Sequence, residues 1–124
     1  MRFVFAALLA AHGIAHLVGF VASWRLADLP DLPYKTTILG GRVDVEDGGI
    51  RIIGLFWFAA AAAFCLAAFA VAAQWPSALR LTGLVIAGST LLCIVGWPDA
   101  RIGLWLNLAL AVLVVVAIRM QWAI

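Results

Sequence analysis

The chain alternates long apolar runs with short polar segments, and the runs are the feature that decides the predicted fold. Four runs are evident, at residues 3–24, 52–74, 81–97 and 102–118. The first two reach the roughly 20 residues that a helix needs to cross a hydrocarbon core of about 30 Å, and the last two approach that length with their flanks. We therefore predict an all-α membrane protein whose four transmembrane helices form a bundle, at about residues 3–24, 51–74, 80–97 and 101–119.

A β-barrel and a signal peptide fit the runs less well than helices do. A membrane β-barrel needs strands that alternate apolar and polar residues, and the segment AAAAAFCLAAFAVAA does not alternate. A secretory signal peptide would account for Arg2 before the first run, but this run exceeds the roughly 7–15 residues of a typical signal-peptide core. We expect a retained first helix and a single domain over residues 1–124.

Composition agrees with a lipid environment. Hydrophobic residues make up 67% of the chain and charged residues 11%, against about 25% charged residues in soluble domains. Four tryptophans fall where a predicted helix leaves the bilayer, as amphipathic rings should: Trp24, Trp75, Trp97 and Trp122. The net charge of +2 is too small to predict a nucleic-acid partner.

One connection is long, at residues 25–50. Within it the β-type segments TTIL and RVDV flank Gly40 and Gly41, which predicts a small β-hairpin with a two-residue type I′ or II′ turn. An isolated hairpin is marginally stable, so we expect this one to form a cap that packs on the helix ends or on a partner.

Charge predicts the orientation. Four helices place the termini and the second connection on one face, with Arg2, Arg80 and Arg119; the opposite face has Arg25, Lys35, Arg42, Arg51 and Arg101. A raw count of three cations against five would put the long loop inside, but carboxylates accompany the cations of that loop, and Arg2 lies directly beside the first helix. We therefore expect the termini on the cytoplasmic side.

Small residues of the second run would let helix backbones approach closely: Gly54, residues 59–63, Ala67 and Ala68. They predict either a compact monomeric bundle or an interface in a homo-oligomer or larger membrane complex.

Polar residues within the runs predict the interior, because polar side chains are costly against acyl chains. At helical spacing, Phe5, Leu9, His12, His16, Gly19 and Ser23 share one face of the first helix; Thr82, Ser89, Thr90 and Cys93 share one of the third. Asn107 is the one amide of the fourth run. We expect these faces to meet.

His12 and His16 admit three interpretations. They form interhelical hydrogen bonds, or they ligate a metal, or they line a pocket for a small amphipathic molecule such as a quinone or lipid and exchange protons there. The i, i+4 spacing suits a metal, but the runs hold no carboxylate and the chain no third histidine. We predict no metal site and no tightly bound cofactor.

The segment GWPDARIG, residues 96–103, supplies further candidates. Asp99 precedes the fourth helix and could simply cap it. On the predicted topology it also lies in the same half of the membrane as His16 and Asn107. The candidate ligand-binding residues are His12, His16, Trp97, Asp99 and Asn107.

Three segments, HGIAHLVGF, LADLPDLP and WPDARIGLWLN, resemble a group of small bacterial four-helix membrane proteins with HGxxHxxGF, ADLP and WxDA[KR]xG…N elements. The resemblance implies a multi-pass protein of the bacterial inner membrane and assigns no activity. The insertion TTILGGRVDVEDGG departs from that pattern. The start, MRFVF to AHG, is also faintly similar to DoxX-like membrane proteins, some of which are associated with quinone-linked redox complexes.

These observations predict a small membrane binding or accessory protein with a polar site inside the bundle. The alternative is a quinone-linked or metal-binding oxidoreductase component, so whether the chain is an enzyme stays open. A small proton-coupled transporter is a third possibility, which the lack of an intramembrane carboxylate disfavours.

Overall fold

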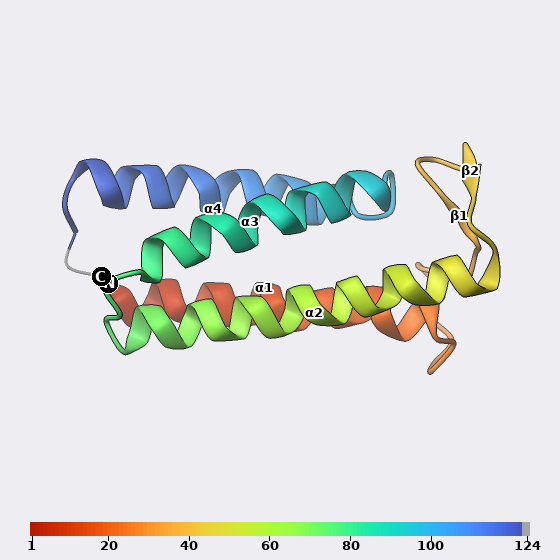
Figure 1. Cartoon of the computed structure of the whole chain (residues 1–124), viewed down its shortest axis with the longest axis horizontal. Helices are drawn as coiled ribbons and strands as arrows, with labels where there is room; N and C mark the ends of the chain where they lie inside the picture. The colour runs from red at the N-terminus through yellow and green to blue at the C-terminus, as the bar shows by residue number, and fades with distance from the viewer. Residues whose placement is uncertain (123–124) are drawn as a thin grey trace.

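In a computed structural model the chain folds into four long helices and one small hairpin (Figure 1). The structure describes residues 1–122. The elements are α1 (Arg2–Ser23), β1 (Thr37–Ile38), β2 (Val43–Asp44), α2 (Glu46–Ala72), α3 (Ala78–Val95) and α4 (Arg101–Arg119). All four helices are long and apolar enough to cross a membrane, as the apolar runs predict.

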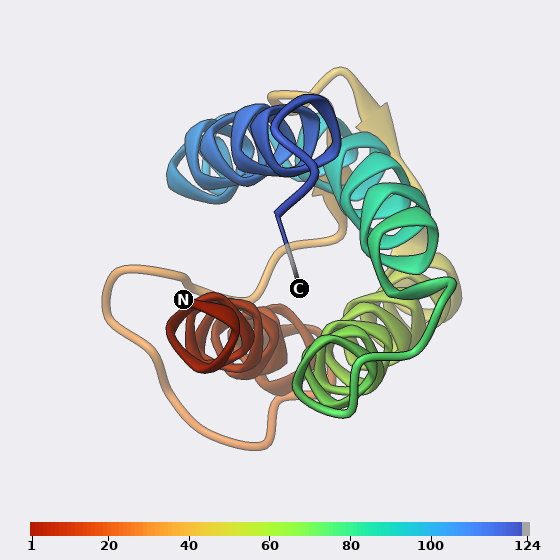
Figure 2. The same ribbon diagram turned by 90° about the vertical axis from the view of Figure 1, so that its left-hand side faces the viewer.

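The arrangement of the helices gives the molecule two distinct ends. The N-terminus, the last turn of α4 and the α2–α3 turn lie at one end, which we call the termini end, whereas the hairpin and the α3–α4 turn lie at the other, which we call the hairpin end (Figure 1). Viewed along the helices, the order around the axis is α1, α2, α3, α4 (Figure 2). The closest packing is between α1 and α2, and the ribbons of α1 and α4 are more widely separated.

Small residues explain the close approach of α1 and α2. A Cβ atom on Gly13 would lie 2.6 Å from Cβ of Phe64 and 3.0 Å from the carbonyl oxygen of Ala61. A Cβ atom on Gly54 would lie 2.7 Å from Cβ of Ser23. Without side chains at these glycines the two backbones can pack directly, as helices do in lipid. The small residues of the second run therefore serve, at least in part, an interface within the chain.

The apolar interior fills the termini half of the molecule. Leu9, Phe64 and Val71 are fully buried there, together with small and branched residues of all four helices. Large apolar side chains also face outward on every helix; Leu84 and Trp105, for example, are 73% and 64% exposed. Such a surface is far more apolar than that of a soluble monomer and fits a multi-pass membrane protein.

The hairpin forms where it is predicted, but its connection is longer. Thr37 pairs with Asp44 and Ile38 with Val43, so residues 39–42 join the strands and the prediction of a two-residue turn is wrong. Residues 39, 40 and 41 adopt φ values of 52°, 67° and 84°. The two glycines allow this left-handed path at little cost.

The second helix begins at Glu46, five residues before the predicted start at residue 51. The carboxylate of Asp44 accepts a hydrogen bond of 2.9 Å from the backbone N–H of Glu46, which satisfies one donor of the first turn. This helix therefore extends beyond the apolar run. The other helix ends lie within about two residues of the predicted ones.

Candidate functional site

Four buried polar side chains from three helices meet near the middle of the molecule, and we call them the inner network. The network consists of His12 and His16 of α1, Ser89 of α3 and Asn107 of α4. None is more than 7% exposed, and Asn107 is not exposed at all. The expectation that the polar faces of these helices turn inward and meet is confirmed for these four residues.

Hydrogen bonds join the inner network into a closed ring. His12 Nε2 lies 2.8 Å from Asn107 Oδ1, and Asn107 Nδ2 lies 2.8 Å from Ser89 Oγ. Ser89 Oγ lies 2.6 Å from His16 Nε2, and His16 Nδ1 lies 2.8 Å from the backbone oxygen of His12. The ring therefore connects α1 to both α3 and α4.

With both imidazoles neutral, the backbone carbonyl of His12 fixes the direction of every bond in this ring. A carbonyl can only accept, so His16 Nδ1 must carry the proton. A neutral His16 then accepts at Nε2 from the Ser89 hydroxyl, whose oxygen accepts from the Asn107 amide N–H. The Asn107 oxygen is left to accept from His12 Nε2–H. Both rings can thus be neutral, and they are opposite tautomers.

One atom of the network remains unmatched. His12 Nδ1 is buried and has no hydrogen-bond partner among the described residues. Because Nε2 carries the proton, Nδ1 is an acceptor, and its complement is a water molecule or a ligand donor. The imidazole of His12 packs edge-on against the phenyl ring of Phe64, with ring centroids 4.8 Å apart. The orientation of His12 is therefore set by both packing and hydrogen bonding.

A pocket of about 410 Å³ lies between the inner network and the hairpin end. His12 and His16 line its deep part, and Trp97 and Asp99 line it from the α3–α4 turn. The structure thus brings four of the five candidate residues to one pocket. Asn107 does not line it but bonds to His12 from α4 and positions that ring.

Trp57 of α2 is a pocket residue that the sequence did not indicate. Its ring lies 5.5 Å from that of His16, and a Cβ atom on Gly19 would lie 2.6 Å from it. Gly19 therefore provides the space that the indole occupies. The apolar pattern of α2 gave no signal that distinguishes Trp57 from residues facing lipid.

Asp99 has a different role from the expected helix cap. The residue before α4 is Ala100, which makes no side-chain capping bond, and the Asp99 carboxylate forms an ion pair with Lys35. The capping prediction is therefore wrong. Lys35 comes from the long loop, so the pair fastens this loop to the α3–α4 turn beside the pocket.

Backbone hydrogen bonds also hold the hairpin on the end of α3. Leu39 N–H donates to the Val95 carbonyl at 2.9 Å, and Gly40 N–H donates to the Trp97 carbonyl at 2.8 Å. Val95 is the last residue of α3, and carbonyls at this position lack partners within their own helix. The hairpin therefore packs on a helix end, as expected, and satisfies that end.

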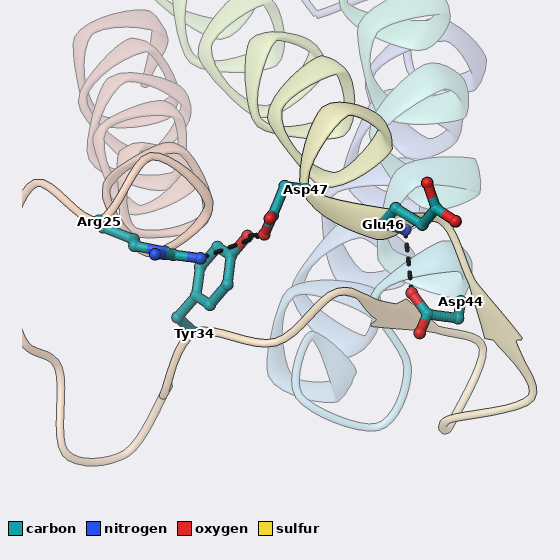
Figure 3. A network of polar contacts seen from close by, with 5 residues as sticks. All are labelled: Arg25, Tyr34, Asp44, Glu46 and Asp47. Carbon is teal, nitrogen blue, oxygen red and sulfur yellow. Dashed lines mark hydrogen bonds and ion pairs between the residues drawn. The ribbon is translucent and has the colours of Figure 1, made fainter.

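A third fastening, the hairpin-end cluster, consists of Arg25, Tyr34 and Asp47 (Figure 3). The Arg25 guanidinium lies 3.7 Å above the Tyr34 ring and 3.1 Å from the Asp47 carboxylate, which also accepts a hydrogen bond from the Tyr34 hydroxyl. Tyr34, and then Asp47, raise the pKa of Arg25.

The pKa of Asp44, at the end of β2, is lowered by the hydrogen bond from the Glu46 N–H.

Within residues 1–122, no three histidine, cysteine, aspartate or glutamate side chains gather closely enough to hold a metal ion. The site has three parts. The hydrogen-bonded inner network forms its deep end, the pocket lies between this network and the hairpin end, and the long loop crosses the hairpin end. Comparison of the chain with models of known protein families, with curated proteins and with solved structures found no match.

Proposed function

We propose that this chain is a small integral protein of the bacterial inner membrane that crosses the bilayer four times and binds a small lipid-soluble molecule. Four helices of sufficient length and apolarity support the crossings. The outward-facing leucine, phenylalanine and tryptophan side chains of all four helices then contact acyl chains. A quinone or a lipid is the kind of ligand that such surroundings supply.

The single observation that carries this proposal is the pocket that His12, His16, Trp97 and Asp99 share. Its volume of about 410 Å³ falls within the range of about 300–1,000 Å³ that small-molecule sites occupy. The pocket also has the usual chemistry of such sites, since apolar and aromatic walls surround a few polar groups. The inner network supports its deep part with a fixed set of hydrogen bonds.

The distribution of charge supports an orientation with the termini in the cytoplasm. All six carboxylate side chains belong to the hairpin end, where five cations give a net charge of 5 − 6 = −1. The termini end has three arginines and no aspartate or glutamate, hence +3. Arg2 lies in the first turn of α1. The count of lysines and arginines alone, three against five, would favour the opposite orientation, so the proposal rests on the place of Arg2 at the start of α1 and on the carboxylates that accompany the cations of the hairpin end.

Mass spectrometry of lipid-soluble compounds that co-purify with the protein tests the proposed function. We expect the wild type to retain a compound that His16→Leu loses about tenfold, since this change removes the ring from the pocket. The matched control is Thr82→Val, because Thr82 is buried in α3 away from the pocket and bonds only to the Ala78 carbonyl. Equal retention by both variants, with both folded, would contradict binding in this pocket.

A further inference from the structure

The long loop covers the pocket at its hairpin end. Leu32, Pro33 and Tyr34 line the pocket from this loop. The Lys35–Asp99 ion pair, the hairpin-end cluster and the backbone bonds to α3 hold the loop in place. In Figure 2 the loop passes across the far end of the space between α1 and α4. The cover is partial, because the lining residues Trp97 and Lys35 are also about half exposed at this end.

On the side between α1 and α4, the pocket is bordered by described residues that also face outward. Val18 of α1 and Ile102 and Leu106 of α4 line the pocket, yet they are 45%, 68% and 47% exposed on the outer surface. The same residues therefore border both the pocket and the surroundings of the helices. If the helices cross a bilayer, this border faces acyl chains and the pocket opens toward lipid.

Charges around the pocket cancel. Lys35 and Asp99 are the charged side chains among its described lining residues, and they pair with each other. The hydrogen-bonded ring accommodates both imidazoles at the deep end in their neutral forms. A ligand with a net charge would lie unpaired between the apolar walls of the deep end, which is costly, and at the hairpin end it would meet an ion pair whose two charges already satisfy each other. An uncharged ligand meets neither obstacle.

We propose that the pocket takes an amphiphile without net charge, and that this molecule enters sideways from the bilayer between α1 and α4. The inference rests on the proposed function of the pocket as a binding site, and it adds the ligand's charge class and its route. Lys35 and Asp99 together select against charged molecules, and the gap bordered by Val18, Ile102 and Leu106 admits the neutral ones.

Three photoreactive probes with one tail test the charge class: hexadecanol, hexadecanoic acid and hexadecylamine, each with a diazirine at the same carbon. The protein is kept in phosphatidylcholine nanodiscs, and labelled residues are located by mass spectrometry. We expect hexadecanol to label pocket residues about tenfold more than either charged probe. Equal or stronger labelling by the acid or the amine would overturn the charge class.

Two substitutions make the test of the charge class more specific, because each leaves one charge of the Lys35–Asp99 pair without its partner. Lys35→Met frees the Asp99 carboxylate, so labelling by hexadecylamine should rise several-fold toward that by hexadecanol. Asp99→Asn frees the Lys35 ammonium, so labelling by hexadecanoic acid should rise instead. If both variants keep the wild-type order of the three probes, the ion pair does not select the ligand and the inference fails.

The rate of labelling by hexadecanol tests the route. Leu106→Trp narrows the side opening and should slow labelling about tenfold, whereas Ile118→Trp, on an outward position of α4 away from the pocket, should not. Arg25→Ala loosens the loop by removing contacts with Tyr34 and Asp47 but replaces no residue that lines the pocket, and the rate should stay within about twofold of the wild type. If the labelling rate rises in Arg25→Ala and does not change in Leu106→Trp, the entrance lies at the loop and the proposed route is wrong.

Failure of the inference differs from failure of the proposed function. If hexadecanol, acid and amine all label the pocket equally, the pocket binds amphiphiles but does not select by charge. If none of them labels any pocket residue in folded wild-type protein, the pocket is not a site for lipid-phase molecules, and both proposals are overturned.

Discussion

Two polar regions connect α1 to the rest of the molecule, the inner network and the hairpin-end cluster. The first is buried and held by hydrogen bonds, whereas the second is exposed and held by an ion pair. The inner network is buried and neutral, and each of its members bonds to another side chain or to the His12 carbonyl. The hairpin-end cluster uses full charges, but the side chains of Arg25 and Asp47 are 58% and 68% exposed. In the inner network, protein partners replace water at the buried polar side-chain atoms other than His12 Nδ1, whereas the hairpin-end cluster shares its partners with water.

The difference teaches where a polar group contributes to structure in such a protein. Inside the bundle, removing one partner leaves a buried donor or acceptor without a protein group to replace it, which costs the desolvation of that group. At the hairpin end, water and salt replace a lost partner at little cost. The weaker contacts there suit a loop that covers a pocket, and the stronger ones suit the fixed deep part of that pocket.

The largest expected effect breaks the buried region by moving α1 away from α2. In Gly13→Ala the new Cβ atom would meet Phe64 Cβ at 2.6 Å and the Ala61 carbonyl at 3.0 Å, so the helices must separate. We expect a loss of about 1–3 kcal/mol in unfolding free energy, measured by steric trapping in bicelles. The control is Gly83→Ala, which meets nothing within 4 Å. Equal losses at both glycines would show that close packing of α1 on α2 is not required.

The next effect removes one member of the inner network. Asn107→Leu leaves His12 Nε2–H without its acceptor and Ser89 without a donor. We expect the unfolding free energy to fall by about 1–2 kcal/mol, near the upper end for polar contacts in membranes. Trp105→Leu, at an exposed position of the same helix, should change it by less than about 0.5 kcal/mol. A negligible cost for Asn107→Leu would contradict a network that replaces water.

A smaller effect is expected in the exposed region. Arg25→Ala removes the ion pair with Asp47 and the stacking on Tyr34, which should lower the unfolding free energy by less than Asn107→Leu does because both charges are largely in water. The cost should shrink further in 1 M salt, where the Debye length is about 3 Å. Urea or thermal melts at two salt concentrations measure it. A loss as large as that of Asn107→Leu, and independent of salt, would erase the contrast between the two regions.

The smallest effect concerns pH. The Glu46 N–H, and then Thr36, hold the pKa of Asp44 below its usual value, which is about 3.9 in the unfolded chain. A lowered folded-state pKa means that the carboxylate favours folding above about pH 4 and that this contribution is lost as the pH falls through the folded-state pKa. Titration of the Asp44 carboxyl by NMR should show the lowered value, and Thr36→Val, which removes the second donor, should restore it in part. An unshifted titration in the wild type would mean that the bond from Glu46 does not start α2.

Sequence sufficed for the features that depend on composition along the chain. The apolar runs predicted all four helices, and the spacing of His12 and His16 predicted the inward face of α1. It failed where a contact depends on how distant segments meet. Asp99 was expected to cap α4, because nothing in its neighbourhood indicates that Lys35, far away in the loop, would reach it.

The start of α2 and the pocket residue Trp57 show two further limits. Hydropathy reports the part of a helix that matches the bilayer, so it missed the polar turn that begins at Glu46. Trp57 reaches the pocket because Gly19 on another helix leaves room for its ring. Such a pairing depends on the register between α1 and α2, which periodicity within one helix does not specify.

The most direct test of the buried ring is the tautomeric state of its two histidines, measured by ¹⁵N NMR of labelled protein in bilayers at neutral pH. The hydrogen bonds of the inner network predict that His12 carries its proton on Nε2 and His16 on Nδ1, with neither imidazole charged. Spectra in which both histidines share one tautomer, or in which either is a cation, would contradict it.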